Sequence, residues 1–202
     1  MARAPVTGAL LAGGASRRMG RDKRLLNIDG VPMALRAARA LAATSDELLI
    51  VMAPDRPLDA RIFESLGARR VQDRRTDAGP LAGLEAALDV ARHDLVLVAA
   101  ADMPWLAPAL LSHLAERLAQ APAETDAVAV ATPRGPQPML AAYRRHVLPI
   151  VTRLLDAREL RMGTLLAMLR VAALAPDEWR RFDPTGRSVL NVNRPADLAR
   201  GA

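Results

Sequence analysis

The sequence contains no cysteine, which excludes disulfide bonds and metal sites built on thiolates. Aromatic residues make up only 2% of the chain, although 51% of it is hydrophobic. A core must therefore be built mainly from alanine, leucine and valine. The lack of cysteine is typical of proteins in a reducing compartment, and we expect this protein to be cytoplasmic.

Long hydrophobic runs are also missing, since a membrane-spanning helix takes about 20 apolar residues. The apolar run over residues 95–101 is far shorter and lies between Asp94 and Asp102. The first residues show no charged region followed by an apolar one, so we expect neither a secretory signal nor a membrane contact. With 25% charged residues, the chain is typical of a globular protein, and its 202 residues fit one domain over 1–202.

The net charge of +6 indicates an attraction to anions, but the basic residues are not gathered into one tract. They are spread along the chain among Asp and Glu residues, and the aromatic side chains that would stack nucleic-acid bases are nearly absent. We therefore expect no dedicated nucleic-acid surface. Small phosphorylated substrates would explain the excess positive charge equally well.

Lysine is almost absent: Lys23 is the single lysine among 28 basic residues. It closes a glycine-rich run over residues 11–23, which also carries Arg17 and Arg18. Arginine is a planar fork whereas lysine is a compact point charge, so the two are not interchangeable at a tight phosphate site. The run matches neither the P-loop nor the G-x-G-x-x-G pattern. We predict a phosphate-binding loop here; a plain strand-to-helix turn with a surface lysine is the alternative interpretation.

Apolar runs alternate with helical spacing along the whole chain. Strands are predicted over residues 6–12, 47–53, 70–72, 95–101, 127–131, 139–144 and 171–174, and helices over 32–43, 62–66, 81–92, 109–120, 146–157, 164–170 and 195–200. This alternation predicts an α/β fold, with one Rossmann-like, open and mostly parallel sheet and helices on both faces. Such sheets bind ligands beyond the carboxyl ends of their strands, which here means after Ala12, Gln72 and Ala101.

Two aspartates follow predicted strands at this edge. Asp102 comes directly after the most apolar strand, and Mg²⁺ commonly takes one or two carboxylates together with phosphate oxygens. Its alternative role is to cap the next helix, which begins several residues later, near Pro108. Asp73 precedes a run of small residues that leaves room for a flat ligand; a solvated turn before a helix starting at Pro80 explains this run equally well.

Near the C-terminus, Asn191 and Asn193 are spaced so that both amides would project from one face of an extended segment. A turn before the last helix is the default interpretation of this pair. The three histidines lie far apart, without the spacing of metal ligands or of a catalytic triad, and we assign them no role.

Taken together, these motifs resemble the molybdenum cofactor guanylyltransferases of the MobA type, which belong to the wider nucleotidyltransferases. Their opening pattern L-A-[GA]-G-x-S-x-R-M-G-x-D-K is filled at every signature position by residues 11–23. Residues 79–83, 102–104, 137–138 and 191–193 carry the motifs G-P-L-A-G, D-M-P, Q-P and N-V-N in the order of that family. The likeness covers nearly the whole chain.

The resemblance implies a role for each matching residue. A guanine nucleotide would be cradled by Leu11, Ala12, Gly13 and Gly14, with Arg18 and Lys23 on its phosphates, Asp73 on the nucleoside and Asp102 holding Mg²⁺. The second substrate, molybdopterin, would be bound by Gly79, Pro80, Asn191 and Asn193. The chain departs from the family pattern at Ala53, where an asparagine is frequent, so one expected nucleotide contact lacks its side chain.

The implied reaction is the transfer of GMP from GTP to the terminal phosphate of the molybdenum cofactor, with release of pyrophosphate and with Arg18, Lys23 and Asp102 as the catalytic residues. GTP and molybdopterin are the expected partners, alongside transient contacts with proteins that supply or accept the cofactor. A cytidylyl- or sugar-phosphate transferase of the same superfamily is the nearest alternative. Cytidylyl relatives tend to have alanine in place of Gly13, which favours guanine. A non-catalytic nucleotide-binding module is the second alternative.

Overall fold

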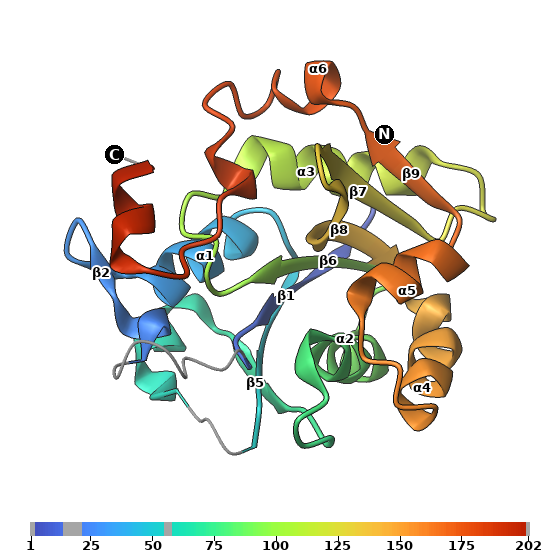
Figure 1. Cartoon of the computed structure of the whole chain (residues 1–202), viewed down its shortest axis with the longest axis horizontal. Coiled ribbons are helices and arrows are strands. Elements are labelled where there is room, and N and C mark those ends of the chain that lie inside the picture. Colours follow the sequence, from blue (N-terminus) through green and yellow to red (C-terminus); the bar gives the residue numbers. More distant parts are fainter. Residues whose placement is uncertain (1–2, 14–21, 55–57, 201–202) are drawn as a thin grey trace.

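The computed structural model describes residues 3–13, 22–54 and 58–200 of the chain. Within this part, a seven-stranded sheet runs through the molecule in the order β5-β4-β1-β6-β8-β7-β9 (Figure 1). The strands are β1 Val6–Leu11, β4 Glu47–Met52, β5 Arg69–Gln72, β6 Leu95–Ala100, β7 Ala127–Thr132, β8 Gly135–Arg144 and β9 Val171–Leu174. β8 runs antiparallel to both of its neighbours and the other pairs are parallel, so the predicted mostly parallel sheet is confirmed.

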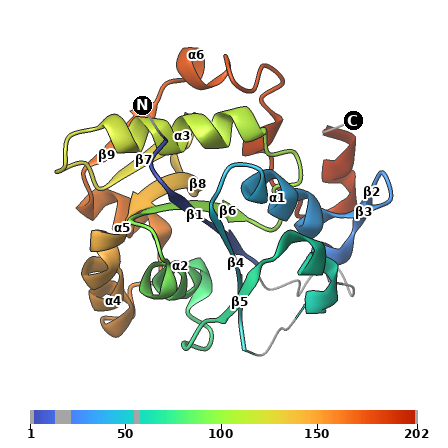
Figure 2. The ribbon, with the colours of Figure 1, turned by 180° about the vertical axis from the view of Figure 1, so that it is seen from behind.

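Helices cover both faces of the sheet, as predicted. Helices α1 Met33–Ala42 and α3 Pro108–Gln120 pack on one face, whereas α2 Gly79–Val90, α4 Leu148–Asp156 and α5 Met162–Met168 pack on the other (Figures 1 and 2). The strands supply side chains to both cores because their residues alternate between faces. Leu97 of β6 lies in the core with α1 and α3, and the next residue, Val98, lies in the core with α2.

Several predicted elements differ at their ends or in type. The helix expected over residues 164–170 is α5, which begins two residues earlier and ends at Met168. The helix expected from His146 starts as the 3₁₀ turn η3 Arg145–Val147 before α4. The segments expected as helices over 62–66 and 195–200 are the 3₁₀ helices η2 Ala60–Leu66 and η5 Pro195–Arg200. Short elements at chain ends and loops have few core contacts, and periodicity predicts them poorly.

The sequence prediction missed five short elements. They are the 3₁₀ helix η1 Lys23–Leu25, the hairpin strands β2 Asn27–Ile28 and β3 Val31–Pro32, helix α6 Pro176–Trp179 and the 3₁₀ helix η4 Arg187–Val189. The hairpin turn uses Asp29 at φ 51° and Gly30 at φ 77°, a pair of left-handed residues that suits a tight two-residue turn. In both views of the ribbon, η5 lies beside this hairpin, so the C-terminal segment comes back to the N-terminal part of the chain (Figures 1 and 2).

In the described ranges, no helix has both the length and the apolar character needed to cross a membrane.

Candidate active site

A cavity of about 480 Å³ opens at the carboxyl ends of β1, β4, β5 and β6. This is the edge of the sheet where the sequence places its functional residues. Nine of the candidate residues line it: Leu11, Ala12, Gly13, Lys23, Asp73, Gly79, Pro80, Asp102 and Asn191. Two further candidates, Gly14 and Arg18, lie outside the described residues. The remaining one, Asn193, does not line the cavity but contacts a residue that does.

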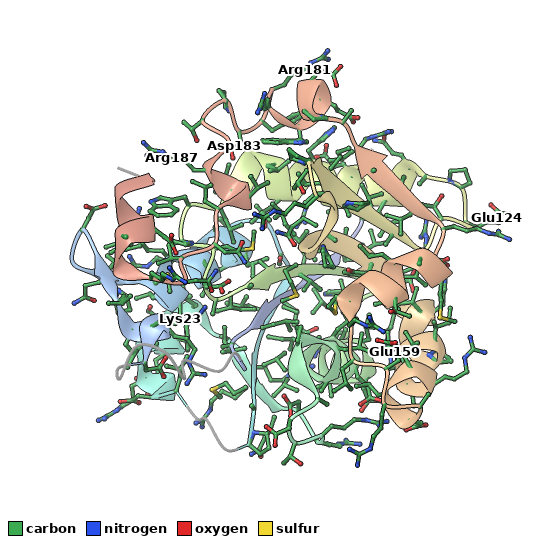
Figure 3. The ribbon with its side chains drawn as sticks, viewed as in Figure 1. Lys23, Glu124, Glu159, Arg181, Asp183 and Arg187 are labelled. Carbon is green, nitrogen blue, oxygen red and sulfur yellow. The ribbon has the colours of Figure 1, made fainter. Side chains whose placement is uncertain are left out.

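Lys23 connects three distant segments of the chain at one side of this cavity. Its Nζ atom donates hydrogen bonds to Asp102 Oδ2 at 2.8 Å and to Asn193 Oδ1 at 2.9 Å. The lysine opens the 3₁₀ helix η1 Lys23–Leu25, Asp102 follows β6, and Asn193 belongs to the C-terminal segment. In Figure 3, Lys23 lies on the same side of the molecule as Asp183 and Arg187 of that segment. The lysine singled out by the sequence thus meets both the predicted metal carboxylate and one of the paired asparagines.

The Lys23–Asp102 ion pair is largely withdrawn from solvent. Only 13% of the lysine side chain and 18% of the aspartate side chain are exposed, so water screens the pair less than a surface pair. A main-chain hydrogen bond of 2.8 Å, from the amide of Val192 to the carbonyl of Asp102, ties the C-terminal segment to the same point. The arrangement holds a fixed positive charge at the edge of the cavity.

Asp102 also has an oxygen that can take a metal ion. Its Oδ1 atom is buried, and no group in the described part of the chain donates a hydrogen bond to it. A buried carboxylate oxygen without a donor carries a cost that a bound cation would remove. Among the described residues, no cluster of three or more His, Asp or Glu side chains could hold a metal alone. The donor set therefore fits Mg²⁺ that completes its coordination with phosphate oxygens.

Arg24 is a second cation at the cavity, and the sequence analysis missed it. The guanidinium is almost fully buried, pairs with Asp22 at 2.6 Å, and donates to the carbonyl of Ala12 at the end of β1. It thereby fixes the course of the chain on both sides of the glycine-rich loop. Its position next to Lys23 was the only signal in the sequence.

Asp73 lies at the far side of the cavity from Lys23 and is buried, with 6% of the residue exposed. Its amide donates to the carbonyl of Met52 at 3.0 Å, which continues the β4–β5 pairing past the end of the strands. Gly13 faces it: a Cβ atom on Gly13 would lie 3.7 Å from Asp73 Oδ2 and 3.5 Å from the Cβ of Ala53. The glycine, the aspartate and Ala53, the residue that departs from the family pattern, therefore meet at one place.

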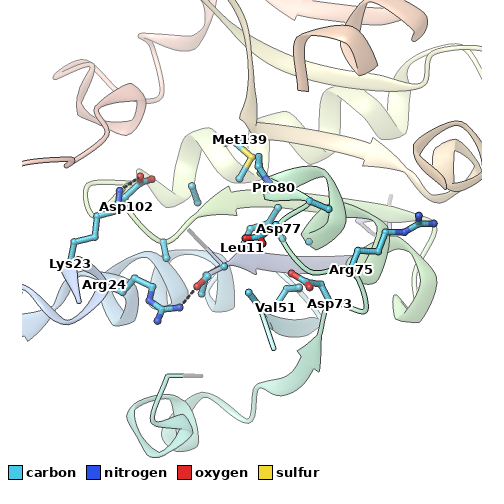
Figure 4. Close-up of a pocket in the computed structure, with 18 of the residues that line it drawn as sticks. Leu11, Lys23, Arg24, Val51, Asp73, Arg75, Asp77, Pro80, Asp102 and Met139 are labelled. Carbon is cyan, nitrogen blue, oxygen red and sulfur yellow. Dashed lines mark hydrogen bonds and ion pairs between the residues drawn. The ribbon is translucent and has the colours of Figure 1, made fainter. Parts of the chain in front are cut away.

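Arg75 braces the loop that carries Asp73. The guanidinium pairs with Glu85 of α2 through two hydrogen bonds of 2.8 and 2.9 Å and with Asp156 of α4 at 2.8 Å. These hydrogen bonds raise the pKa of Arg75, so it stays charged at any relevant pH. Arg75 lines the cavity, as Figure 4 shows, and no pattern in the sequence indicated this role.

The first turn of α2 forms another wall. The chain enters this helix through Asp77 at φ 55° and Gly79 at φ 65°, and its N-cap residue is Ala78, whose side chain makes no capping hydrogen bond. Amide groups at an uncapped helix start can bind an anion. Further along, a Cβ on Gly83 would lie 3.5 Å from the side chain of Leu11, so the glycine lets the helix pack closely on β1.

Comparison with known proteins agrees with this geometry. Residues 8–172 match the family described as the MobA-like NTP transferase domain. The chain is 37% identical to a probable molybdenum cofactor guanylyltransferase of Chloroflexus aggregans, covering 96% of this chain and 91% of the relative. It is 38% identical to one of Deinococcus radiodurans, covering 96% and 93%.

A solved structure supports the same assignment. The molybdopterin-guanine dinucleotide biosynthesis protein A of Archaeoglobus fulgidus superposes with a TM-score of 0.78 at 27% identity, covering 96% of this chain and 95% of the other. The shared fold and the matched motifs thus support membership of the same family. The chain belongs to the MobA-like family of nucleotidyltransferases.

Proposed function

We propose that this protein transfers GMP from GTP to the terminal phosphate of molybdopterin in the molybdenum cofactor and releases pyrophosphate. The observation that carries the proposal is the meeting of Lys23 and Asp102, at 2.8 Å, on the edge of a cavity lined by the nucleotide-binding motifs. The names of the relatives support the choice of GTP and molybdopterin as substrates.

The chemistry brings two anions together, so charge neutralisation and in-line positioning supply most of the catalysis. Lys23 takes up negative charge on the departing pyrophosphate, and the family motif assigns Arg18 to the phosphates as well. Asp102 would hold Mg²⁺ through its buried Oδ1 atom. A bound Mg²⁺ would supply neutralisation of the negative charge on the phosphate oxygens. No covalent intermediate on the protein is required.

The remaining residues position the substrates. The nucleotide is held by Leu11, Ala12, Gly13 and Gly14 at the end of β1, and Asp73 binds the nucleoside. Gly79 and Pro80 at the start of α2, together with Asn191 and Asn193, serve the molybdopterin. Arg24 and Arg75 support the loops at the cavity wall, since their guanidinium groups are already engaged by Asp22 and by Glu85.

The first experiment is a melting-temperature screen with GTP, CTP and ATP, each with and without Mg²⁺, because a ligand of the native state raises its stability. We expect the largest increase with GTP and Mg²⁺. A larger increase with CTP would favour a cytidylyltransferase instead.

The second experiment measures pyrophosphate release from GTP with molybdopterin as acceptor. Release that requires both substrates and Mg²⁺ supports the proposal. Nucleotide binding without any release would leave a non-catalytic nucleotide-binding module. The expected cytoplasmic location and transient contacts with cofactor-supplying or cofactor-accepting proteins belong to this same proposal.

A further inference from the structure

Strand β8 is interrupted where the motif Gln137–Pro138 occurs. On its β7 side, Ala141 lies opposite Ala129, but Gln137 already lies opposite the next residue, Val130. Residues 138–140 therefore fall inside a bulge. On its β6 side, the pairing of β8 ends at Leu140, opposite Ala99. Bulges of this kind redirect side chains and are frequent next to active sites.

Two residues of the chain hold this bulge in place. Pro138 has no amide hydrogen and so cannot donate to either neighbouring strand. Its carbonyl accepts a hydrogen bond of 2.8 Å from the hydroxyl of Tyr143, whose residue is completely buried. Burial raises the pKa of Tyr143, so the hydroxyl keeps its proton and remains a donor. This hydrogen bond gives the Pro138 carbonyl a donor inside the bulge.

The bulge directs Met139 toward the cavity. Met139 lines the cavity together with Pro80 and Asp102, and it is only partly buried. It packs against the cores on both faces of the sheet, at the point where the pairing of β8 with β6 has just ended. In Figure 4 it lies beside Pro80; its strand β8 is separated from β5, which Asp73 follows, by β4, β1 and β6. A methionine that only filled the core would be fully buried by the surrounding core side chains, whereas Met139 is partly exposed to the cavity.

The order of the strands indicates which substrate contacts the part of the cavity that Met139 lines. With the nucleoside on Asp73, after β5, and the reacting phosphates at Asp102, after β6, the acceptor is expected further along the strand order, on the β8 side of the cavity where Pro80 and Met139 lie. The acceptor named by the proposed function carries a pterin, whose pyrimidine ring is flat and aromatic. A thioether is soft and polarisable and makes favourable contacts with aromatic rings.

We propose that Met139 is a specificity-determining residue that contacts the pterin ring of the acceptor, and that Tyr143 is a positioning residue that holds it there through Pro138. This inference rests on the proposed function, because that function names the acceptor. It gives the Gln137–Pro138 motif a physical role. The proline cannot donate to a neighbouring strand and so interrupts the pairing, and the hydroxyl of Tyr143 stabilises the bulge through its hydrogen bond to the Pro138 carbonyl.

The test compares Met139→Ala, Met139→Leu, Tyr143→Phe and the double variant of Met139→Ala with Tyr143→Phe. Met168→Ala is the matched control, since Met168 is 45% exposed on α5. The affinity for a fluorescent monophosphorylated pterin is measured by its own emission, and the affinity for GTP with Mg²⁺ by calorimetry. KM values for molybdopterin and GTP are then measured on the same proteins.

We expect Met139→Ala to weaken pterin binding about two- to tenfold, with GTP affinity unchanged. Met139→Leu, which keeps the volume, should recover most of the loss. Tyr143→Phe should weaken pterin binding as well, and the double variant should bind no more weakly than Met139→Ala, because the tyrosine acts only through the methionine.

Three results would overturn the inference: a wild-type protein that does not bind the pterin, a Met139→Ala variant that binds it as the wild type does, or equal losses for pterin and GTP. A variant of Tyr143 that lowers the melting temperature but leaves pterin affinity intact would reduce that residue to a structural role. Pterin binding by a wild type that fails to transfer GMP would contradict the proposed function and leave this inference standing.

Discussion

Lys23 Nζ lies 2.8 Å from Asp102 Oδ2, although 79 residues separate the two in the sequence. The pair joins the loop after β1 to the end of β6. The oxygen of Asp102 that would take a metal ion, Oδ1, is not the one that Lys23 contacts, so the ion could bind with the pair intact. Each charge keeps the other in place at the edge of the cavity.

The first prediction concerns the choice of lysine. Lys23→Arg keeps the charge, but a planar fork cannot occupy the position of the ammonium between Asp102 and Asn193. We expect kcat to fall by about 100-fold or more, with the melting temperature little changed. Steady-state kinetics check this, with Arg134→Lys on an exposed turn as the control. Near-wild-type turnover of Lys23→Arg would contradict the prediction that this position requires a lysine.

The second prediction concerns the metal carboxylate. Asp102→Ala should abolish Mg²⁺-dependent transfer, because the buried Oδ1 is the proposed metal ligand, and it should leave the fold intact. A titration of GTP binding with Mg²⁺, followed by calorimetry, should lose the stimulation by the ion. Full activity with an ordinary Mg²⁺ requirement would refute the assignment of Asp102.

The third prediction separates two roles for Asn193. The resemblance assigns it to the molybdopterin, yet its Oδ1 accepts a hydrogen bond from Lys23 at 2.9 Å. We expect Asn193→Ala to weaken the binding of GTP with Mg²⁺ about two- to fivefold even without molybdopterin, since a partly exposed, charge-assisted hydrogen bond is lost. GTP affinity equal to that of the wild type would restrict Asn193 to the second substrate.

The fourth prediction concerns the base. The added Cβ of Gly13→Ala would make ordinary contacts of 3.5 Å with Ala53, so the fold should tolerate it. The methyl group occupies space in the nucleotide side of the cavity, and we expect the preference for GTP over CTP to fall about tenfold or more. The melting-temperature screen with both nucleotides measures this. An unaltered preference would show that guanine is selected elsewhere.

The fifth prediction concerns pH and stability at the opposite edge of the sheet. Burial opposes the charge on Glu47, but hydrogen bonds from the amide of Arg92 and from Thr7, together with the charge of Arg69, outweigh it and lower its pKa below the ordinary 4.5. A lowered pKa in the folded state means that this carboxylate stabilises the protein above its unfolded pKa and loses that effect as the pH falls through the folded pKa.

We therefore expect Glu47→Gln to cost about 1–3 kcal/mol of unfolding free energy at neutral pH, because it weakens a buried, charge-assisted network. The difference from the wild type should shrink as the pH falls below about 4. Urea denaturation of both proteins at neutral and acidic pH measures it. A difference that grows with acid would contradict the sign of the shift.

Much of the fold could be predicted from the sequence, because hydrophobic periodicity is a local property. Residues 95–101 form a continuous apolar run since β6 is covered on both faces, and β6 ends within one residue of the prediction. The position of Asp102 directly after that run, and the single lysine Lys23, indicated two residues that line the candidate site without any knowledge of their contacts.

The sequence by itself determined which residue types are available at the carboxyl ends of the strands, because the apolar runs that form strands and the polar residues that follow them can be read along the chain. Only the tertiary structure decided which of them meet. It brought Lys23 to Asp102 and Asn193, buried Arg24 against the end of β1, and turned Met139 into the cavity through a bulge. Those contacts depend on the packing of segments distant in sequence and on side-chain directions, which no local pattern encodes.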